Sequence, residues 1–112
     1  MQQITDIGSI ARQSFKFQIE GGELAEFVLY FSDTQRCWFL DLTYGDFITK
    51  GLRVVNSINM LSPYKNILRF GLVCLVKDGF EPWFVDDFST GRASLYITNI
   101  EEINTLEKIA YA

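Results

Sequence analysis

Histidine is absent from this chain of 112 residues. Its absence removes the commonest general base and the commonest metal ligand, together with Ser-His-Asp and Cys-His catalysis. The glycines are spread through turns, so no phosphate-binding glycine loop is present. One acidic cluster, Glu81, Asp86 and Asp87, lacks the spacing of a calcium loop, and we interpret these side chains as solvated turn carboxylates. The sequence therefore predicts no enzymatic activity, no cofactor and no tightly held metal ion.

Basic residues and long apolar runs are also scarce. Ten Lys and Arg residues stand singly against fourteen Asp and Glu, which gives a net charge of −4 at pH 7. The usual electrostatic source of nucleic-acid binding is therefore missing. No apolar run approaches the roughly 18 residues of a membrane span. Residues 1–12 do not resemble a signal peptide, so we expect synthesis in the cytoplasm of a host cell.

Two cysteines, Cys37 and Cys74, both fall inside predicted strands. A small domain stabilised by disulfides would need more of them. We interpret both as small buried apolar side chains, with a redox pair as the alternative.

What the sequence does contain is apolar alternation with the period of a β-strand. Hydrophobic residues make up 48% and aromatic residues 15%, enough for one packed domain. Residues 13–20, 24–32 and 37–44 each alternate between an apolar and a more polar face. The shared apolar face comprises Phe15, Phe17, Phe27, Leu29, Phe31, Trp38, Leu40 and Leu42.

Pairing across the turn at residues 33–36 opposes apolar residues on this face: Phe31 to Trp38, Leu29 to Leu40, and Phe27 to Leu42. A three-residue loop at residues 21–23 gives the preceding hairpin the pairs Ile19 with Ala25, Phe17 with Phe27, and Phe15 with Leu29. Both hairpins select the same face, which predicts an antiparallel meander.

The hairpin between residues 37–44 and 47–55 has an open register. A two-residue turn pairs Asp41 with Lys50, whereas a three-residue turn pairs Leu40 with Leu52. We prefer the three-residue turn, and a bulge at Gly51 would reconcile the two.

The second half of the chain alternates less clearly. It predicts a short helical turn begun by Ser57 and closed by Pro63, followed by a central strand at 69–76. An Asp78-Gly79 turn and short strands at 83–85 and 93–98 come next. A helix at about 99–108 is predicted to begin at a capping box at 98–101. The fold expected is mainly β, a small barrel or sandwich with a short C-terminal helix. Residues 1–12 form an N-terminal arm, and residues 13–112 a single domain.

Surface candidates lie away from the predicted core. Val28, Tyr30 and Phe39 share the opposite face of the meander, with Tyr30 directly across from Phe39. Such a patch predicts a second covered face, covered either by the rest of this chain or by another protein. The C-terminal helix adds an apolar side of Ile100, Ile103 and Leu106, and it is short enough to need a packing surface. These six residues are the predicted protein interface.

The run Trp38-Phe39-Leu40-Asp41-Leu42 resembles a strand of the cyanophage-type baseplate plug proteins of contractile-tailed phages. Further matches follow in the family's order over residues 13–102: Gly51-Leu52, Leu61, Tyr64, Gly71-Leu72-Val73, Asp86-Asp87-Phe88, Gly91-Arg92, Leu95-Tyr96 and Glu101-Glu102.

The resemblance implies a non-enzymatic virion structural protein, a plug or hub-associated component of the tail baseplate. It implies contacts with hub, tail-tube and tape-measure proteins, an oligomeric state in the virion, and neither nucleic acid nor membrane as partner. A small β-barrel that binds an apolar ligand is the alternative from another class. An enzyme that uses carboxylates alone is a third.

Overall fold

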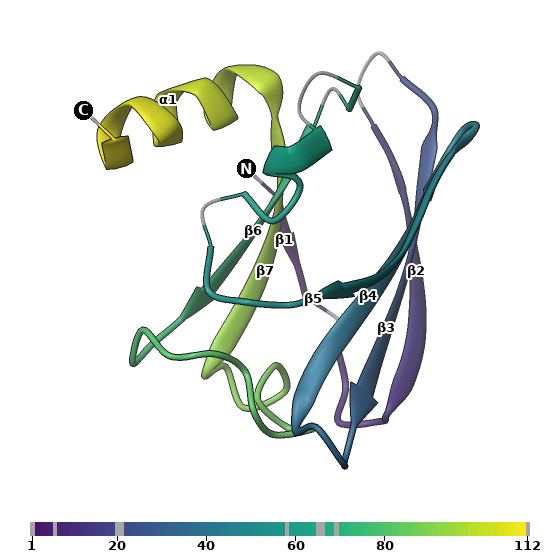
Figure 1. The fold of residues 1–112 in the computed structure, drawn as a ribbon, viewed down its shortest axis with the longest axis vertical. Coiled ribbons are helices and arrows are strands. Elements are labelled where there is room, and N and C mark those ends of the chain that lie inside the picture. The colour runs from purple at the N-terminus through teal and green to yellow at the C-terminus, as the bar shows by residue number, and fades with distance from the viewer. Residues whose placement is uncertain are drawn as a thin grey trace.

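In a computed structural model, the described residues of this protein form two antiparallel β-sheets and a C-terminal helix (Figure 1). The structure describes residues 2–5, 7–19, 22–57, 59–64, 67–68 and 70–111. The sheets face each other without closing into a barrel, so the mainly β prediction is confirmed in its sandwich form.

The first sheet is a meander in the order β2-β3-β4-β5. Its strands are β2 (Arg12–Gln18), β3 (Leu24–Ser32), β4 (Cys37–Tyr44) and β5 (Phe47–Arg53). The second sheet has the order β1-β7-β6, with β1 (Gln2–Ile4), β6 (Phe70–Val76) and β7 (Ala93–Asn99). A 3-10 turn, η1 (Ser62–Tyr64), precedes β6, and α1 (Ile100–Tyr111) follows β7.

The register predicted for β3 and β4 is confirmed, pair by pair: Phe31 lies opposite Trp38, Leu29 opposite Leu40, and Phe27 opposite Leu42. Phe27, Leu29, Trp38, Leu40 and Leu42 are all buried in the core between the sheets.

The register predicted for β2 and β3 is wrong by two residues. Phe17 lies opposite Ala25 and Phe15 opposite Phe27. Gln18 pairs with Leu24, so the connection is two residues longer than predicted; Ile19 N–H donates to the Glu23 carbonyl (3.2 Å), and Gly22 N–H donates to the Ile19 carbonyl (3.0 Å). A shift of two leaves every side chain on its predicted face, since alternation has a period of two. Phe15 and Phe17 accordingly pack against the core and stay partly exposed. Gly21, part of the predicted loop, lies outside the described residues.

A bulge divides the β4–β5 hairpin. Its turn has two residues, so Tyr44 pairs with Phe47, and the preferred three-residue turn is wrong there. Beyond the bulge Leu40 pairs with Leu52, as the three-residue register requires. Gly51 stands at the irregularity with a φ of +72°, a conformation that glycine adopts readily. The predicted bulge is therefore confirmed.

The second half departs further from the predictions. Strand β6 lies at a sheet edge rather than in the centre; its free edge is covered by the preceding segment, where Ser57 and Cys74 form a bridge and Met60 N–H donates to the Leu72 carbonyl. The core on one face and the C-terminal helix on the other explain why the strand is apolar on both faces. Arg69, the predicted first residue of this strand, lies outside the described residues. Pro63 stands inside η1 instead of ending a turn that starts at Ser57.

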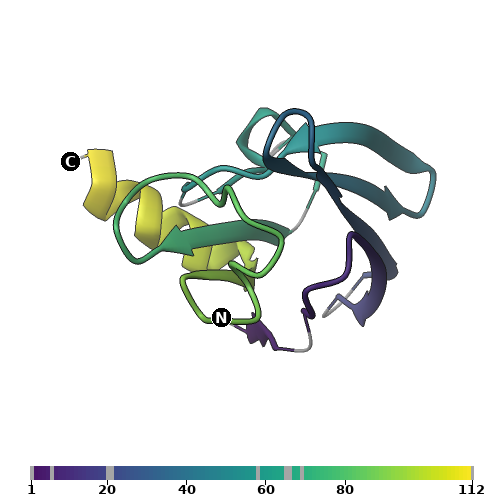
Figure 2. The same ribbon diagram turned by 90° about the horizontal axis from the view of Figure 1, so that it is seen from below.

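The chain ends in a helix whose cap lies one residue beyond the predicted one. Glu102 N–H donates to Asn99 Oδ1 (2.8 Å), and Asn99 N–H donates to Glu102 Oε1 (3.1 Å). Ile103 packs over Gly71 of β6, where a Cβ atom would meet its side chain at 2.6 Å. The helix thus lies on the outer side of the second sheet, as Figures 1 and 2 show. At the other terminus, β1 pairs with β7, and Ile4 and Ile7 are buried.

Candidate functional site

The outer face of the first sheet carries the predicted aromatic patch. Tyr30 and Phe39 lie opposite each other, with ring centroids 5.6 Å apart and planes inclined by 24°. The Arg12 guanidinium lies 5.7 Å from the Tyr30 ring centroid. In Figure 1 the helix lies on the far side of the second sheet, so none of the described helices and strands covers this patch. Val28, Tyr30 and Phe39 are half-buried there.

The phenol of Tyr30 is tied to the same strand pair. Its hydroxyl donates to Asp41 Oδ1 (3.2 Å), and the same oxygen accepts the Gly51 N–H (2.9 Å). Partial burial, followed by the hydrogen bond to Asp41 and its charge, raises the pKa of Tyr30. The patch is therefore held in a fixed geometry by the bulge beside it.

The three helix candidates lie away from this patch, and they differ from one another in how much of each side chain is exposed to solvent. Ile103 is 4% exposed and belongs to the domain's own packing, whereas Ile100 is 49% exposed and Leu106 is half-buried. The structure therefore brings Val28, Tyr30 and Phe39 together, but not with the helix residues. Whether either group meets a partner stays a prediction.

Sequence reasoning missed a third surface, the loop at residues 77–92 between β6 and β7. Phe80, Trp83 and Phe84 are 59%, 41% and 50% exposed on it. The predicted strand at 83–85 is wrong, because these residues form bends and turns. Three aromatic residues within five positions around Pro82, with turn residues on both sides, are the signal that indicates such a loop.

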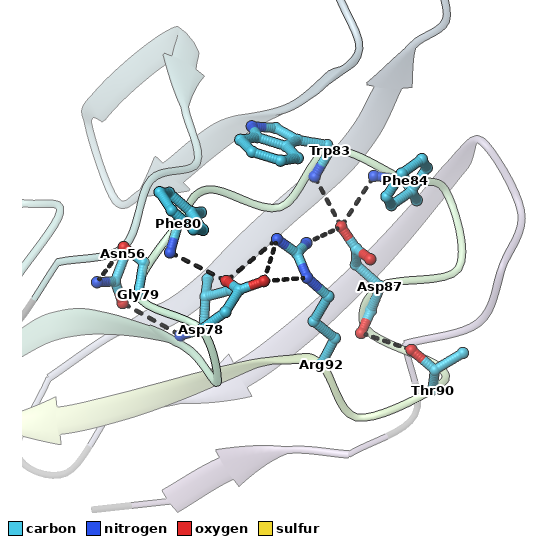
Figure 3. A network of polar contacts seen from close by, with 10 residues as sticks. Asn56, Asp78, Gly79, Phe80, Trp83, Phe84, Asp87, Thr90 and Arg92 are labelled. Carbon is cyan, nitrogen blue, oxygen red and sulfur yellow. Dashed lines mark hydrogen bonds and ion pairs between the residues drawn. The ribbon is translucent and has the colours of Figure 1, made fainter.

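The buried carboxylate of Asp87 holds this loop together through hydrogen bonds. Its Oδ2 accepts the N–H groups of Trp83 (2.6 Å) and Phe84 (2.8 Å) and the Nη1 of Arg92 (2.7 Å), as Figure 3 shows. Asp87 is 2% exposed, so the prediction of a solvated carboxylate is wrong for this residue. The sequence interpretation mistook this structural carboxylate for a solvated one. A buried carboxylate with three donors is the arrangement that compensates its desolvation.

Arg92 connects Asp87 to the start of the loop. Its Nε and Nη2 lie 3.1 Å from Asp78 Oδ2, and Asp78 Oδ1 accepts the Phe80 N–H at 3.0 Å. The hydrogen bond from Phe80, and then that from Arg92, lower the pKa of Asp78. The Arg92 guanidinium also lies 5.3 Å from the Trp83 ring centroid. One arginine therefore joins both ends of the loop to its aromatic tip (Figure 3).

The core of the domain anchors the same loop. Trp38 Nε1–H donates to the Phe84 carbonyl (3.1 Å), and Arg53 of β5 pairs with Glu81 at 2.7 Å. The backbone of Phe84 is thus held on both sides while its ring stays exposed. This explains how an exposed apolar side chain keeps a defined position.

Two hollows lie where this loop meets the β3–β4 turn. One of about 300 Å³ is lined by Gln35, Arg36, Arg53, Trp83 and Phe84; we call it the arginine cleft. A larger one of about 660 Å³ adjoins it, shares Arg36, Trp83 and Phe84 with it, and is also lined by Asp33, Val85 and Asp86. Arg36 has a φ of +51°, the one positive value among the non-glycine residues that the structure describes.

Across the described ranges, no group of three or more cysteine and acidic side chains gathers in a way that could hold a metal ion. Within those same ranges, no helix has both the length and the apolar character needed to span a bilayer. Cys37 and Cys74 are buried and free, and burial raises the pKa of Cys74 to about 12.

These features define a small two-sheet β protein that presents ordered aromatic side chains on more than one surface. The chain belongs to the family described as cyanophage baseplate Pam3 plug gp18, whose model matches residues 1–101. The match spans both sheets and the 77–92 loop and ends in the first turn of α1. No curated protein matches the sequence. The resemblance to baseplate plug proteins is therefore confirmed, and the chain is a structural protein of a phage baseplate by family.

Proposed function

We propose that this chain is a non-enzymatic virion protein that acts as a plug at the tail tip, held by contacts with hub, tail-tube and tape-measure proteins. The observation that carries the proposal is the family match over residues 1–101. The chain is made in the cytoplasm of the bacterial host and becomes part of the baseplate in more than one copy. The absence of histidine agrees with a role that needs no acid–base chemistry.

The distribution of aromatic residues supports a contact function. Tyrosine, tryptophan and arginine dominate the binding energy of protein interfaces. Tyr30 with Arg12 forms one such group on the first sheet, and Trp83 with Arg92 forms another on the 77–92 loop. Two separate groups fit a component that touches more than one neighbour, as a plug inside a ring of other proteins does.

The alternative function, a β-barrel that binds an apolar ligand, is less well supported. The space between the sheets holds large side chains, with Phe27, Trp38 and Phe70 all fully buried there. Native mass spectrometry of the purified chain separates the two functions. The plug proposal predicts the mass of protein alone, whereas a stoichiometric apolar ligand would favour the alternative.

The plug proposal is tested in the phage itself. Baseplates purified from virions should contain this chain, and a phage that lacks its gene should produce incomplete tail tips and recover when the gene is supplied from a plasmid. A control phage with a disrupted gene for a capsid decoration protein should keep normal tail tips. Baseplates that are complete without the chain would contradict the proposal. The gene is also expected to lie among tail-tube, tape-measure and hub genes.

A further inference from the structure

The arginine cleft combines charge and aromatic surface in one place. Gln35 and Arg36 come from the β3–β4 turn, Arg53 ends β5, and Trp83 and Phe84 come from the 77–92 loop. Among the residues that the structure describes, no carboxylate lines this cleft, although the chain as a whole carries a net charge of −4. Arg53 is already paired with Glu81, so Arg36 is the positive charge that the cleft offers to an anionic group.

Arg36 is the arginine of this cleft whose guanidinium is available to a partner. Among the described residues it forms no ion pair, while Arg53 at the same cleft pairs with Glu81 at 2.7 Å. Arg36 also has a φ of +51°, where an arginine is strained and glycine or asparagine is the usual residue. A strained residue at a cleft is typical of a binding position, because folding alone would favour glycine there.

Hydrogen bonds within the chain hold the backbone that carries the aromatic wall of the cleft. Asp87 fixes the N–H groups of Trp83 and Phe84, and the Trp38 indole fixes the Phe84 carbonyl. The Phe80 ring stacks on Trp83 at 5.7 Å between centroids. A partner that docks here finds the backbone of both residues, and the ring of Trp83, already in contact with the rest of the chain, which lowers the entropy cost of binding.

We propose that the arginine cleft is the docking site for a segment of another baseplate protein that presents a carboxylate next to an aliphatic or aromatic side chain. The carboxylate pairs with Arg36, whose guanidinium offers two parallel N–H donors, and the apolar side chain lies against Trp83 and Phe84. Arg36 also lines the neighbouring hollow, where Asp33 and Asp86 disfavour an anion, so the carboxylate is expected on the side of Arg36 that faces the cleft with Arg53. The identity of the partner as a baseplate protein rests on the proposed plug function.

The chemistry is tested first with peptides on the full-length chain. The probes are acetyl-Gly-Glu-Phe-Gly-amide and the same peptide with Gln in place of Glu, titrated while the NMR signal of the Trp83 indole N–H is followed. The Glu peptide is expected to shift this signal and to bind about tenfold more tightly than the Gln peptide, because a charged hydrogen bond is lost in the second. Equal binding of the two peptides, or no shift of Trp83, would overturn the proposal.

Matched variants assign the effect to the cleft. Arg36→Gly should abolish the preference for the Glu peptide, whereas Arg12→Gln, which removes the same charge on the outer face of the first sheet, should leave it unchanged. Phe84→Ser should weaken both peptides, whereas Ile48→Ser, at an apolar side chain on β5 that is 61% exposed against 50% for Phe84, should weaken neither. Loss of preference in Arg12→Gln as well would show a general charge effect and refute the site.

The role of the arginine cleft in baseplate assembly is tested in phage. Phage that carries Arg36→Gly should incorporate less of the chain into baseplates than phage that carries Arg12→Gln. Normal incorporation of Arg36→Gly would show that the cleft is not a contact site in the baseplate, and the proposed plug function would be unaffected. Absence of the wild-type chain from baseplates, with intact peptide preference, would instead refute the plug function. A dimer in sedimentation that Arg36→Gly abolishes would make a second copy the occupant and overturn the assignment to another protein.

Discussion

At the scale of single residues, Trp38 links the interior of this protein to its most exposed aromatic surface. Its side chain is 0% exposed, and its ring lies 5.4 Å from the rings of Phe31 and Phe88. Its indole N–H reaches the carbonyl of Phe84. The residue therefore serves both the packing of the core and the position of the 77–92 loop.

Replacing Trp38 separates these two roles. Trp38→Ala should lower the free energy of unfolding by about 3–5 kcal/mol, because a large buried side chain leaves a cavity. Trp38→Phe keeps much of the ring volume but leaves the Phe84 carbonyl without its donor, which should cost about 1–3 kcal/mol. Urea unfolding measures both values, and amide exchange at residues 83–84 should rise in the Phe variant. A loss below about 1 kcal/mol for Trp38→Ala would contradict the assigned burial.

Arg36 is expected to cost stability in the isolated chain. Arg36→Gly should raise the free energy of unfolding by about 1 kcal/mol, because glycine adopts a positive φ without strain. The control is Gln35→Gly, one position earlier at a residue without positive φ, which should lower stability through the added freedom of the unfolded chain. Thermal and urea unfolding of both variants provide the comparison. A clear loss of stability in Arg36→Gly would mean that the side chain, rather than the backbone, matters to the fold.

At the scale of elements, the 77–92 loop depends on ionised Asp78. The hydrogen bonds from Phe80 and Arg92 lower its pKa below the usual value of 3.8. A carboxyl whose pKa is lowered by folding contributes stability above its unfolded pKa, and that contribution is lost as the pH falls through its folded pKa. The loop should therefore loosen in acid below about pH 4 while the sheets persist.

The measurement is Trp83 fluorescence together with the exchange rate of the Phe80 amide between pH 2 and 7. In Asp78→Asn the acid-dependent step should disappear, and the loop should be looser at neutral pH. Asp46→Asn, at the exposed β4–β5 turn, is the matched control and should titrate like the wild type. An acid step of equal size in Asp78→Asn would assign it to another carboxyl group.

Alternation along the strands predicted the faces of the first sheet but not every register. Phe15 and Phe17 turn inward as expected, yet they stand two residues from their predicted partners. The period of a strand fixes the face and leaves shifts of two open, and the local geometry of the 19–23 loop decides between them. Between β4 and β5, both candidate registers are present, one on each side of the bulge at Gly51.

The candidate surfaces were only partly predictable for a related reason. Tyr30 opposite Phe39 follows from a local hairpin, so the sequence predicts it. The arginine cleft joins residues 35–36, Arg53 and residues 83–84, and no periodicity relates segments so far apart in sequence. The buried state of Asp87 depends on Arg92 and on two backbone N–H groups, which become neighbours only when the loop closes. Element type was therefore predictable where contacts are local.

At the scale of the whole molecule, the apolar surfaces are distributed over different sides. The patch of Tyr30 and Phe39 lies on the outer face of the first sheet, and α1 with exposed Ile100 lies on the outer side of the second sheet (Figure 1). The 77–92 loop lies at the end of the molecule where the β3–β4 turn also lies. A component enclosed by other proteins needs contacts in several directions, and this distribution supplies them.

The double variant Tyr30→Ser, Phe39→Ser tests the first of these surfaces. The two rings stack on an outer face that no described helix or strand covers, so their loss should cost the isolated chain about 1–2 kcal/mol and leave it folded. Incorporation into baseplates should fall strongly, because the patch is a predicted interface. Circular dichroism and urea unfolding measure the first effect, and quantitative mass spectrometry of purified baseplates measures the second.

The matched control for the double variant is Ile48→Ser, on the same outer face beside Thr43. It removes an exposed apolar side chain outside the aromatic patch and should change neither stability nor incorporation. A double variant that unfolds would show that Tyr30 and Phe39 belong to the domain's own core. A folded double variant that enters baseplates as readily as Ile48→Ser would instead refute the patch as an interface. Because stability and assembly are measured separately, each of these outcomes decides one part of the prediction.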